Sequence, residues 1–287
     1  MANRVQIPSV DLWGGFEAVD SLLVVLAPLW DDDEPLLLDF SACGFIGVDA
    51  LTILTVLKFQ RTRQELETGI DWSTMTDKLK KQFGKWGLAS VFGRPNHPWA
   101  DTAIPLLHQP KYDSAALVDF VEKRVVTSGH MPKMTRELAK EVRKSFCELF
   151  NNVFLHSNSA IGGVAIGQLY PKIQQVQVCV CDAGIGLVEL VQSRGHATVS
   201  PTEAIIWALQ QGNSTSDDDS PHGLGLYLLR EFIKVNGGDF RIYANNGHYA
   251  EDSGVPTGRL LQAAMPGTLI ELRLIIRDDV TYALSSD

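Results

Sequence analysis

Three polar residues that could face a phosphate ligand recur every four positions in one stretch of the sequence: Glu148, Asn152 and His156. An α-helix turns ~100° per residue, so side chains four positions apart stay neighbours on one face. The amide oxygen of Asn152 is a hard ligand of the kind that Mg²⁺ accepts beside phosphate and water oxygens. His156 could approach a phosphate or could interact with the C-terminal end of the helix dipole.

Residues 134–157 predict the helix that would position this polar row. Apolar residues recur there at i, i+4, i+8, i+11 and i+15, which is typical of a helix with one buried face. They are Leu138, Val142, Phe146, Leu149 and Val153. The polar row is therefore not needed for packing, although a solvated polar face is the simpler alternative.

Two glycine-containing segments follow the predicted helix. Residues 176–182 alternate like a strand and end in Asp182-Ala-Gly-Ile-Gly186, where small residues let the backbone approach a ligand closely. Gly223-Leu-Gly-Leu226 precedes an apolar-periodic helix, so free amides and the positive end of its dipole suit a phosphate there. Ordinary turn chemistry is the alternative for the first segment. The helix and the two segments together predict a nucleotide pocket.

The stretch between the glycine segments combines a helical pattern with a polar run. Residues 201–211 are typical of a helix, and residues 212–220 form a polar sequence with three aspartates at 217–219. A lid ordered by nucleotide is the functional interpretation, and a solvated loop is the alternative. Pro221 and His222 stand just before Gly223, where proline removes one amide donor.

In order and spacing, these segments resemble the boxes of the GHKL ATPase superfamily, which includes gyrases, histidine kinases and anti-sigma-factor kinases. Residues 148–156 resemble its N box, residues 182–186 its first glycine box, residues 223–226 the end of its second, and Gly267-Thr268 its final element. The resemblance covers residues 113–277. It implies the Bergerat ATP-binding fold, a two-layer α+β sandwich, with ATP and Mg²⁺ as ligands.

The resemblance also implies a role for each matched residue. Asn152 corresponds to the Mg²⁺ ligand, Glu148 to the catalytic carboxylate that activates water, and Asp182 to the acceptor of the adenine amino group. The implied nucleotide-binding residues are Asn152, Asp182, Gly184, Gly186, Gly223, Leu224, Gly225, Leu226 and Thr268.

Composition limits the function classes. The chain has 287 residues, of which 45% are hydrophobic, so we expect two globular domains. A net charge of −9 argues against general binding to nucleic acid or to an anionic membrane. The four cysteines lack zinc or CxxC spacing, and no long apolar run is present, so reduced thiols and a cytoplasmic location are expected.

The first 95 residues predict alternating strands and helices, with strands at 22–27, 36–40 and 68–72 and helices at 48–66 and 78–83. Such alternation favours a mixed or parallel sheet.

The segments 36–51 and 79–88 resemble the signature of STAS domains, the fold of anti-sigma-factor antagonists. Where regulated members of that family carry a phosphorylated Ser or Thr, this chain has Val48-Asp49. We therefore expect no phosphorylation switch of that kind. A helix cap is the simpler interpretation of Asp49, and a fixed negative charge is the alternative.

Four prolines between residues 93 and 111 predict a linker. The expected organisation is a STAS-like mixed-sheet domain at 1–95, a proline-rich linker at 96–112 and a GHKL-type domain at 113–287, which begins with Asp113 as a helix N-cap.

The sequence thus predicts an α/β regulatory protein that binds ATP and Mg²⁺ and acts as a nucleotide-dependent switch. ATPase activity and serine/threonine kinase activity toward a STAS-type partner are the enzymatic alternatives, and a non-catalytic ATP sensor is the third. The expected partner is a protein, of the STAS or transcription-regulatory class, and homodimer formation stays open. A histidine kinase is not expected, because His130 stands beside Pro132 without a long heptad pattern.

Overall fold

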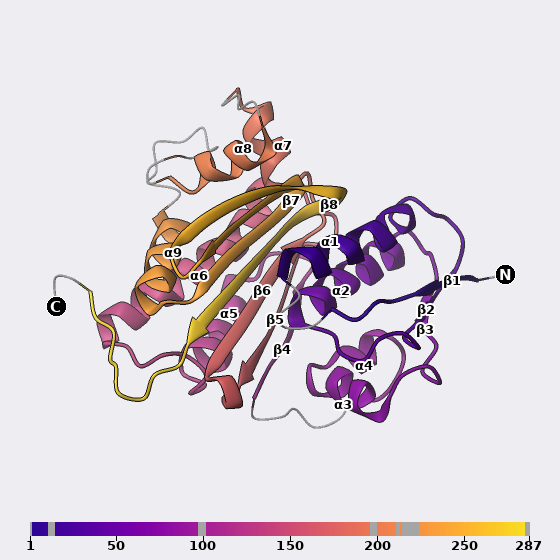
Figure 1. Cartoon of the computed structure of the whole chain (residues 1–287), viewed down its shortest axis with the longest axis horizontal. Coiled ribbons are helices and arrows are strands. Elements are labelled where there is room, and N and C mark those ends of the chain that lie inside the picture. The colour runs from indigo at the N-terminus through magenta and orange to yellow at the C-terminus, as the bar shows by residue number, and fades with distance from the viewer. Residues whose placement is uncertain are drawn as a thin grey trace.

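The chain combines helices and sheets in a mixed α/β architecture, seen in a computed structural model that describes residues 2–10, 15–96, 102–195, 200–210, 213 and 224–284 (Figure 1). The strands are β1 (Asn3–Gln6), β2 (Leu36–Asp39), β3 (Thr68–Ile70), β4 (Ala103–Gln109), β5 (Gly163–Tyr170), β6 (Gln175–Asp182), β7 (Asp239–Asp252) and β8 (Val255–Ile275). The helices are α1 (Gly15–Leu26), α2 (Val48–Arg63), α3 (Asp77–Lys85), α4 (Leu88–Val91), α5 (Ser114–Phe120), α6 (Arg136–His156), α7 (Leu187–Ser193), α8 (Pro201–Ala208) and α9 (Leu224–Asn236).

The larger sheet is antiparallel and has five strands in the order β4-β5-β6-β8-β7. Side chains alternate along β6, as the pleat requires. Val176, Val178 and Val180 join the apolar cluster under α6 and α9, whereas Cys179 and Cys181 join the cluster on the opposite face. Both faces of this sheet are therefore covered.

The opposite face is covered by the residues 2–10 and 15–96, which we call the N-terminal unit. Its three strands form a parallel sheet in the order β1-β2-β3. Helices α1 and α2 lie between this small sheet and the five-stranded one (Figure 1). Their apolar residues form one continuous cluster with side chains of β5, β6 and β8, so the N-terminal unit packs directly on the larger sheet.

The predicted linker at 96–112 contains a strand, which corrects that expectation. Residues 103–109 form β4, at the edge of the five-stranded sheet. An edge strand tolerates proline because one side of its backbone needs no partner. Pro105 lies where the pairing with β5 shifts register, between Ile104 and Leu107. The prolines therefore mark an edge strand with a bulge within the expected linker.

The strand predicted at 22–27 is also wrong, because these residues belong to α1 and the turn that follows it. The buried residues of α1 include Val19, Leu22, Leu23 and Leu26, spaced as on one helix face. A short apolar run does not distinguish a strand from a buried helix, and the helix is recognisable only when the polar residues before Leu22 are considered with it.

The other expected elements are found within a few residues of their predicted bounds, and Asp113 caps α5 by accepting from Ala116 N. Asp49 is not the N-cap of α2, which is Gly47; its Oδ1 accepts from Ala50 N at 2.8 Å, and its side chain is buried. All four cysteines are free thiols. Among the described helices, none is long and apolar enough to cross a membrane.

Candidate functional site

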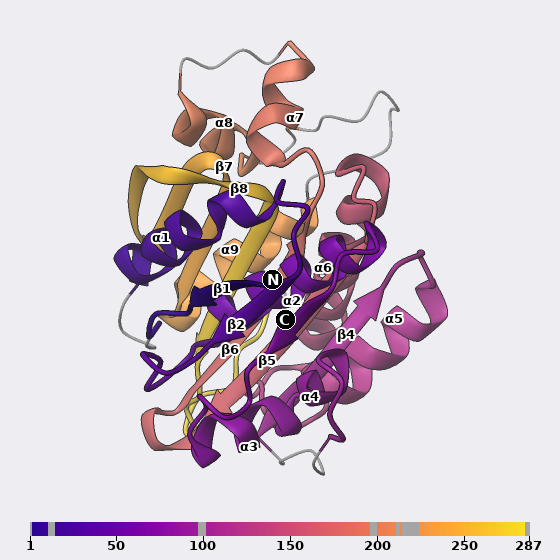
Figure 2. The same cartoon turned by 90° about the vertical axis from the view of Figure 1, so that its right-hand side faces the viewer.

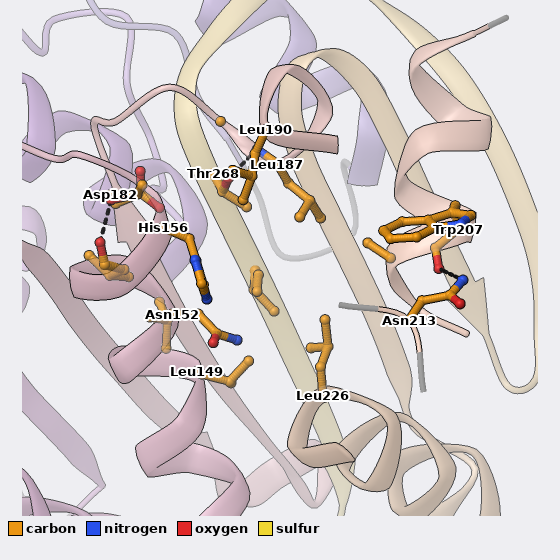
Figure 3. A pocket seen from close by; sticks show the side chains of 16 residues that line it. Leu149, Asn152, His156, Asp182, Leu187, Leu190, Trp207, Asn213, Leu226 and Thr268 are labelled. Carbon is orange, nitrogen blue, oxygen red and sulfur yellow. Dashed lines mark hydrogen bonds between the residues drawn. The ribbon is translucent and has the colours of Figure 1, made fainter. Parts of the chain in front are cut away.

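Helix α6 carries the polar row and is held in place by its apolar face. Thr135 caps the helix by accepting from Leu138 N, and the five residues of the predicted apolar stripe are all buried. With that face fixed against the sheet, Asn152 and His156 project from α6 into a cavity (Figure 3). The apolar stripe therefore determines where these two side chains point.

The cavity lies between α6, the five-stranded sheet, α7, α8 and the start of α9. Its volume is about 120 Å³, roughly ten times what one water molecule needs, so an organic ring fits. The apolar lining consists of Leu149, Val153, Val180, Leu187, Leu190, Trp207, Ala208, Leu226 and Ile270. The polar lining consists of Asn152, His156, Ser157, Asp182, Asn213 and Thr268. An apolar wall with a few polar groups is typical of small-molecule sites.

Asp182 ends β6 and presents a buried carboxylate to the cavity. The backbone amides of Gly184 and Thr268 donate to it, the first at 2.7 Å from Oδ1. Burial nevertheless raises the pKa of Asp182 to about 7. A carboxylate has roughly four acceptor positions, so Asp182 keeps the capacity to accept from a ligand N–H.

The turn after Asp182 requires glycine at two positions. A Cβ on Gly184 would lie 2.0 Å from the Ser157 carbonyl oxygen, and one on Gly186 would lie 2.2 Å from Asn245 Oδ1. Gly186 also has a φ of +81°, which other residues rarely adopt. The protein itself therefore fills the space beside both glycines, whereas the sequence interpretation reserved that space for the ligand. Gly186 still lines the cavity.

Asn245 of β7 holds this turn from the other side, although the sequence interpretation did not include it. Its Nδ2 donates to Ile185 O at 2.9 Å, and its Oδ1 accepts from Glu189 N at 3.3 Å. Asn245 lies at a register shift between β7 and β8, and its backbone has a φ of +51°. In the sequence, Asn-Asn-Gly at 245–247 is a turn signal, which gives no hint of this role.

Thr268 contacts both Asp182, through its backbone amide, and the start of α7, through its side chain. Its Oγ1 accepts from Leu187 N at 2.9 Å, at the first residue of α7. Because the oxygen is engaged as an acceptor, the hydroxyl hydrogen stays available to a ligand in the cavity. The acceptor of Asp182 and the donor of Thr268 thus lie side by side on one wall (Figure 3).

Glu148 is not brought together with Asn152 and His156. It does not line the cavity, and its carboxylate lies against α9, since a Cβ on Gly225 would be 2.3 Å from Glu148 Oε2. A carboxylate at the start of a helix interacts favourably with the helix dipole. The predicted row is thus divided between the cavity and the first turn of α9.

The second glycine segment is only partly described. The described residues do not include Gly223. They also do not include Pro221, His222 or residues 214–220 of the predicted lid. Leu224 begins α9, and Leu226 lines the cavity.

Helix α8 supplies lining residues that sequence reasoning missed. Trp207 and Ala208 face the cavity, and Asn213 donates from Nδ2 to the Trp207 carbonyl oxygen at 2.8 Å. The sequence indicated a helix at 201–211, but it gave no sign of which face would meet the ligand.

The charges of the cavity limit its chemistry. Of its described lining residues, none is a lysine or arginine, and Asp182 is the only carboxylate. In the described part of the chain, no cluster of three or more His, Cys, Asp or Glu side chains could hold a metal ion. A cation here would take the Asn152 amide oxygen and complete its shell with ligand phosphate and water oxygens, a common arrangement for Mg²⁺. The protein thus offers one oxygen donor, the Asn152 amide, to such an ion.

No protein-family model matches this chain, and no curated protein matches its sequence.

Proposed function

We propose that the chain is a nucleotide-controlled regulatory protein that binds ATP with Mg²⁺ in this cavity. One observation carries the proposal: Asn152, Asp182, Gly186, Leu226 and Thr268, chosen from the sequence as nucleotide contacts, line a single cavity although they lie far apart in the chain. An arrangement of this kind supports the GHKL resemblance of residues 113–277. An antiparallel sheet with α6 and α9 on one face agrees with the same proposal.

Adenine matches the polar wall of the cavity. Its exocyclic amino group is a donor and suits the Asp182 carboxylate, and the adjacent ring nitrogen is an acceptor and suits the Thr268 hydroxyl. Guanine has an acceptor where adenine has the amino group, so it would place an oxygen against the carboxylate. The apolar residues on both sides would contact the faces of the ring.

The phosphates would extend toward Asn152 and the start of α9. Free backbone amides and the helix dipole at the N-terminus of α9 favour an anion, and Mg²⁺ supplies positive charge where the described lining has no lysine or arginine. Bound Mg²⁺ would neutralise the phosphates and hold their geometry. Asn152 would orient the ion, and His156 is close enough to the same wall to line the phosphate path.

A catalytic role and a sensing role differ at Glu148. ATP hydrolysis, or transfer of phosphate to a serine or threonine of a STAS-type protein, needs a carboxylate beside the phosphates. The Glu148 carboxylate lies against Gly225 in the first turn of α9 and does not line the cavity, so catalysis requires the phosphates to reach that turn. A non-catalytic ATP sensor, whose phosphates stop short of Glu148, is the second candidate function. Under either function we place the protein in the cytoplasm, with the STAS-like N-terminal unit as its partner-binding part.

The proposal is tested by incubating the purified chain with γ-labelled ATP and Mg²⁺, alone and with STAS-type proteins. Asn152→Ala should weaken Mg²⁺-dependent ATP binding, whereas Glu141→Gln, a substitution on the same helix at a half-buried residue paired with Lys144, should not. Label on protein identifies a kinase, and released phosphate that disappears in Glu148→Gln identifies an ATPase. Binding without either product identifies a sensor, and wild-type protein that binds no ATP refutes the proposal.

A further inference from the structure

The hairpin of β7 and β8 continues beyond the cavity, and we call its residues 247–262 the hairpin extension. There β7 and β8 pair from Gly247↔Leu260 to Asp252↔Val255, past the point where β6 ends its pairing with β8 at Cys181↔Leu269. The extension lies between α8 on one side and α1 of the N-terminal unit on the other (Figures 1 and 2). It therefore touches both the cavity wall and the N-terminal unit.

Helix α8 rests directly on the backbone of the hairpin extension. A Cβ on Gly258 would lie 2.1 Å from Thr202 Cγ2, and one on Gly247 would lie 3.0 Å from Pro201 Cβ. Thr202 Oγ1 also donates to the Arg259 carbonyl oxygen at 3.4 Å. These contacts leave no gap between the first turn of α8 and the hairpin. The other end of α8 carries Trp207, which lines the cavity.

Helix α1 holds the same hairpin from the N-terminal unit. Asp20 is 2% exposed and accepts two hydrogen bonds from Gln262, from the backbone N at 2.9 Å and from Nε2 at 2.8 Å. Arg259 forms an ion pair with Glu17, and its guanidinium lies 4.9 Å from the centre of the Phe16 ring. The residue Arg259 thus contacts α8 through its carbonyl and α1 through its side chain.

The interface between the N-terminal unit and the sheet also contains buried charges. Asp49 of α2 is buried and interacts electrostatically with Glu271 and Arg273 of β8, which are buried too. One oxygen of Glu271, one nitrogen of Arg273 and the Tyr243 hydroxyl have no hydrogen-bond partner among the described residues. Buried ion pairs contribute little net stability, and polar interfaces within a chain are typical of units that can separate. The apolar cluster keeps the N-terminal unit on the sheet, so the part of the contact that can change is the polar one between α1 and the hairpin.

We propose that docking of the N-terminal unit controls the cavity by way of the hairpin extension. When α1 is docked, it holds the extension, the extension supports the first turn of α8, and α8 keeps Trp207 on the cavity wall. This regulation rests on the proposed function, in which the cavity binds ATP. Coupling between two sites is reciprocal, so docking strengthens ATP binding by the same factor by which ATP strengthens docking.

The contact between Asp20 and Gln262 is the place to test this coupling. Asp20→Ala removes both hydrogen bonds to the hairpin, and Gln262→Ala, a milder change at an exposed side chain, removes one. Asp71→Ala is the matched control, because Asp71 bonds Arg4 and Ser73 within the N-terminal unit. Hydrogen exchange of the α8 amides is measured first, without nucleotide.

We expect Asp20→Ala to speed exchange in α8 at least fivefold, Gln262→Ala to act in the same direction with a smaller effect, and Asp71→Ala to leave α8 unchanged. The dissociation constant of Mg²⁺-ATP should rise about tenfold in Asp20→Ala, within the usual range of coupling factors. In the wild type, ATP should slow exchange in α1.

The two proposals fail in different ways. Unchanged α8 exchange in both Asp20→Ala and Gln262→Ala overturns the coupling, as does an ATP dissociation constant equal to that of the wild type. If α8 exchange responds but the wild type binds no ATP, the connection through the hairpin stands and the ATP assignment fails.

Discussion

Asn245 provides the sharpest structural test of how the cavity is built. Its side chain bonds Ile185 O and Glu189 N, and its backbone has a φ of +51°. Asn245→Gly removes both hydrogen bonds but keeps a residue that adopts this φ without strain. Because those bonds hold the turn that ends at Gly186, we expect the substitution to loosen the turn on which a nucleotide would rest.

The size of the effect follows from the two bonds. Each contributes about 1 kcal/mol, so about 2 kcal/mol of support for the turn is lost. If ATP must restore the turn on binding, affinity falls about 30-fold, since 1.4 kcal/mol is tenfold. Asn245→Asp keeps the acceptor for Glu189 N and loses the donor to Ile185 O, so a drop of about fivefold is expected.

The assay is a calorimetric titration with Mg²⁺-ATP, with a thermal melt of each variant as the check on folding. Gln174→Gly is the matched control, because Gln174 has a φ of +50° but lies in the connection between β5 and β6, away from the cavity. ATP affinity of Asn245→Gly within twofold of the control would refute the role given to Asn245.

Three further substitutions test other parts of the structure. Gly184→Ala forces a methyl group within 2.0 Å of Ser157 O and should lower stability by about 1–3 kcal/mol in urea unfolding. Arg61→Met leaves one buried and two partly buried carbonyl groups without their donor and should cost about 3 kcal/mol. Burial raises the pKa of Asp49 to about 7, so the protonated carboxyl contributes stability that is complete below its unfolded pKa of ~3.9 and is lost as pH rises through 7. Asp49→Asn should therefore increase the free energy of unfolding at pH 8 and leave it unchanged at pH 4; an equal change at both pH values would contradict this.

Periodicity predicted the long elements well, because a single buried face determines them. Helix α6 follows from its apolar stripe, and β6 follows from its alternation up to Asp182. The secondary structure of short or proline-containing segments was harder to predict from the sequence. An apolar run such as 22–27 is expected both in a strand and in a buried helix, and these residues proved to belong to α1 and the turn after it. Pro105 is tolerated in β4 only because that strand is at the edge of the sheet.

Those residues of the candidate site were predictable whose position in the fold follows from their residue type and their neighbours in the sequence. Asp182 and Thr268 lie on the same wall because Asp182 ends β6 and Thr268 stands in β8 next to Leu269, where the pairing of β8 with β6 ends. Trp207 and Asn245 depend on contacts between segments distant in sequence, so no local pattern indicated them. The direction of the Glu148 side chain likewise depends on where α9 begins.

The central claim is that Asp182 reads the amino group of a bound adenine, and one titration tests it most directly. Mg²⁺-ATP and Mg²⁺-GTP are titrated into the wild type and into Asp182→Asn. In the variant the amide oxygen is expected to keep the bond from Gly184 N, so an NH₂ group meets the adenine amino group. We predict that the wild type prefers ATP over GTP and that Asp182→Asn weakens ATP binding about tenfold or more. A wild type that binds no ATP, or a variant that binds it equally well, would contradict the claim.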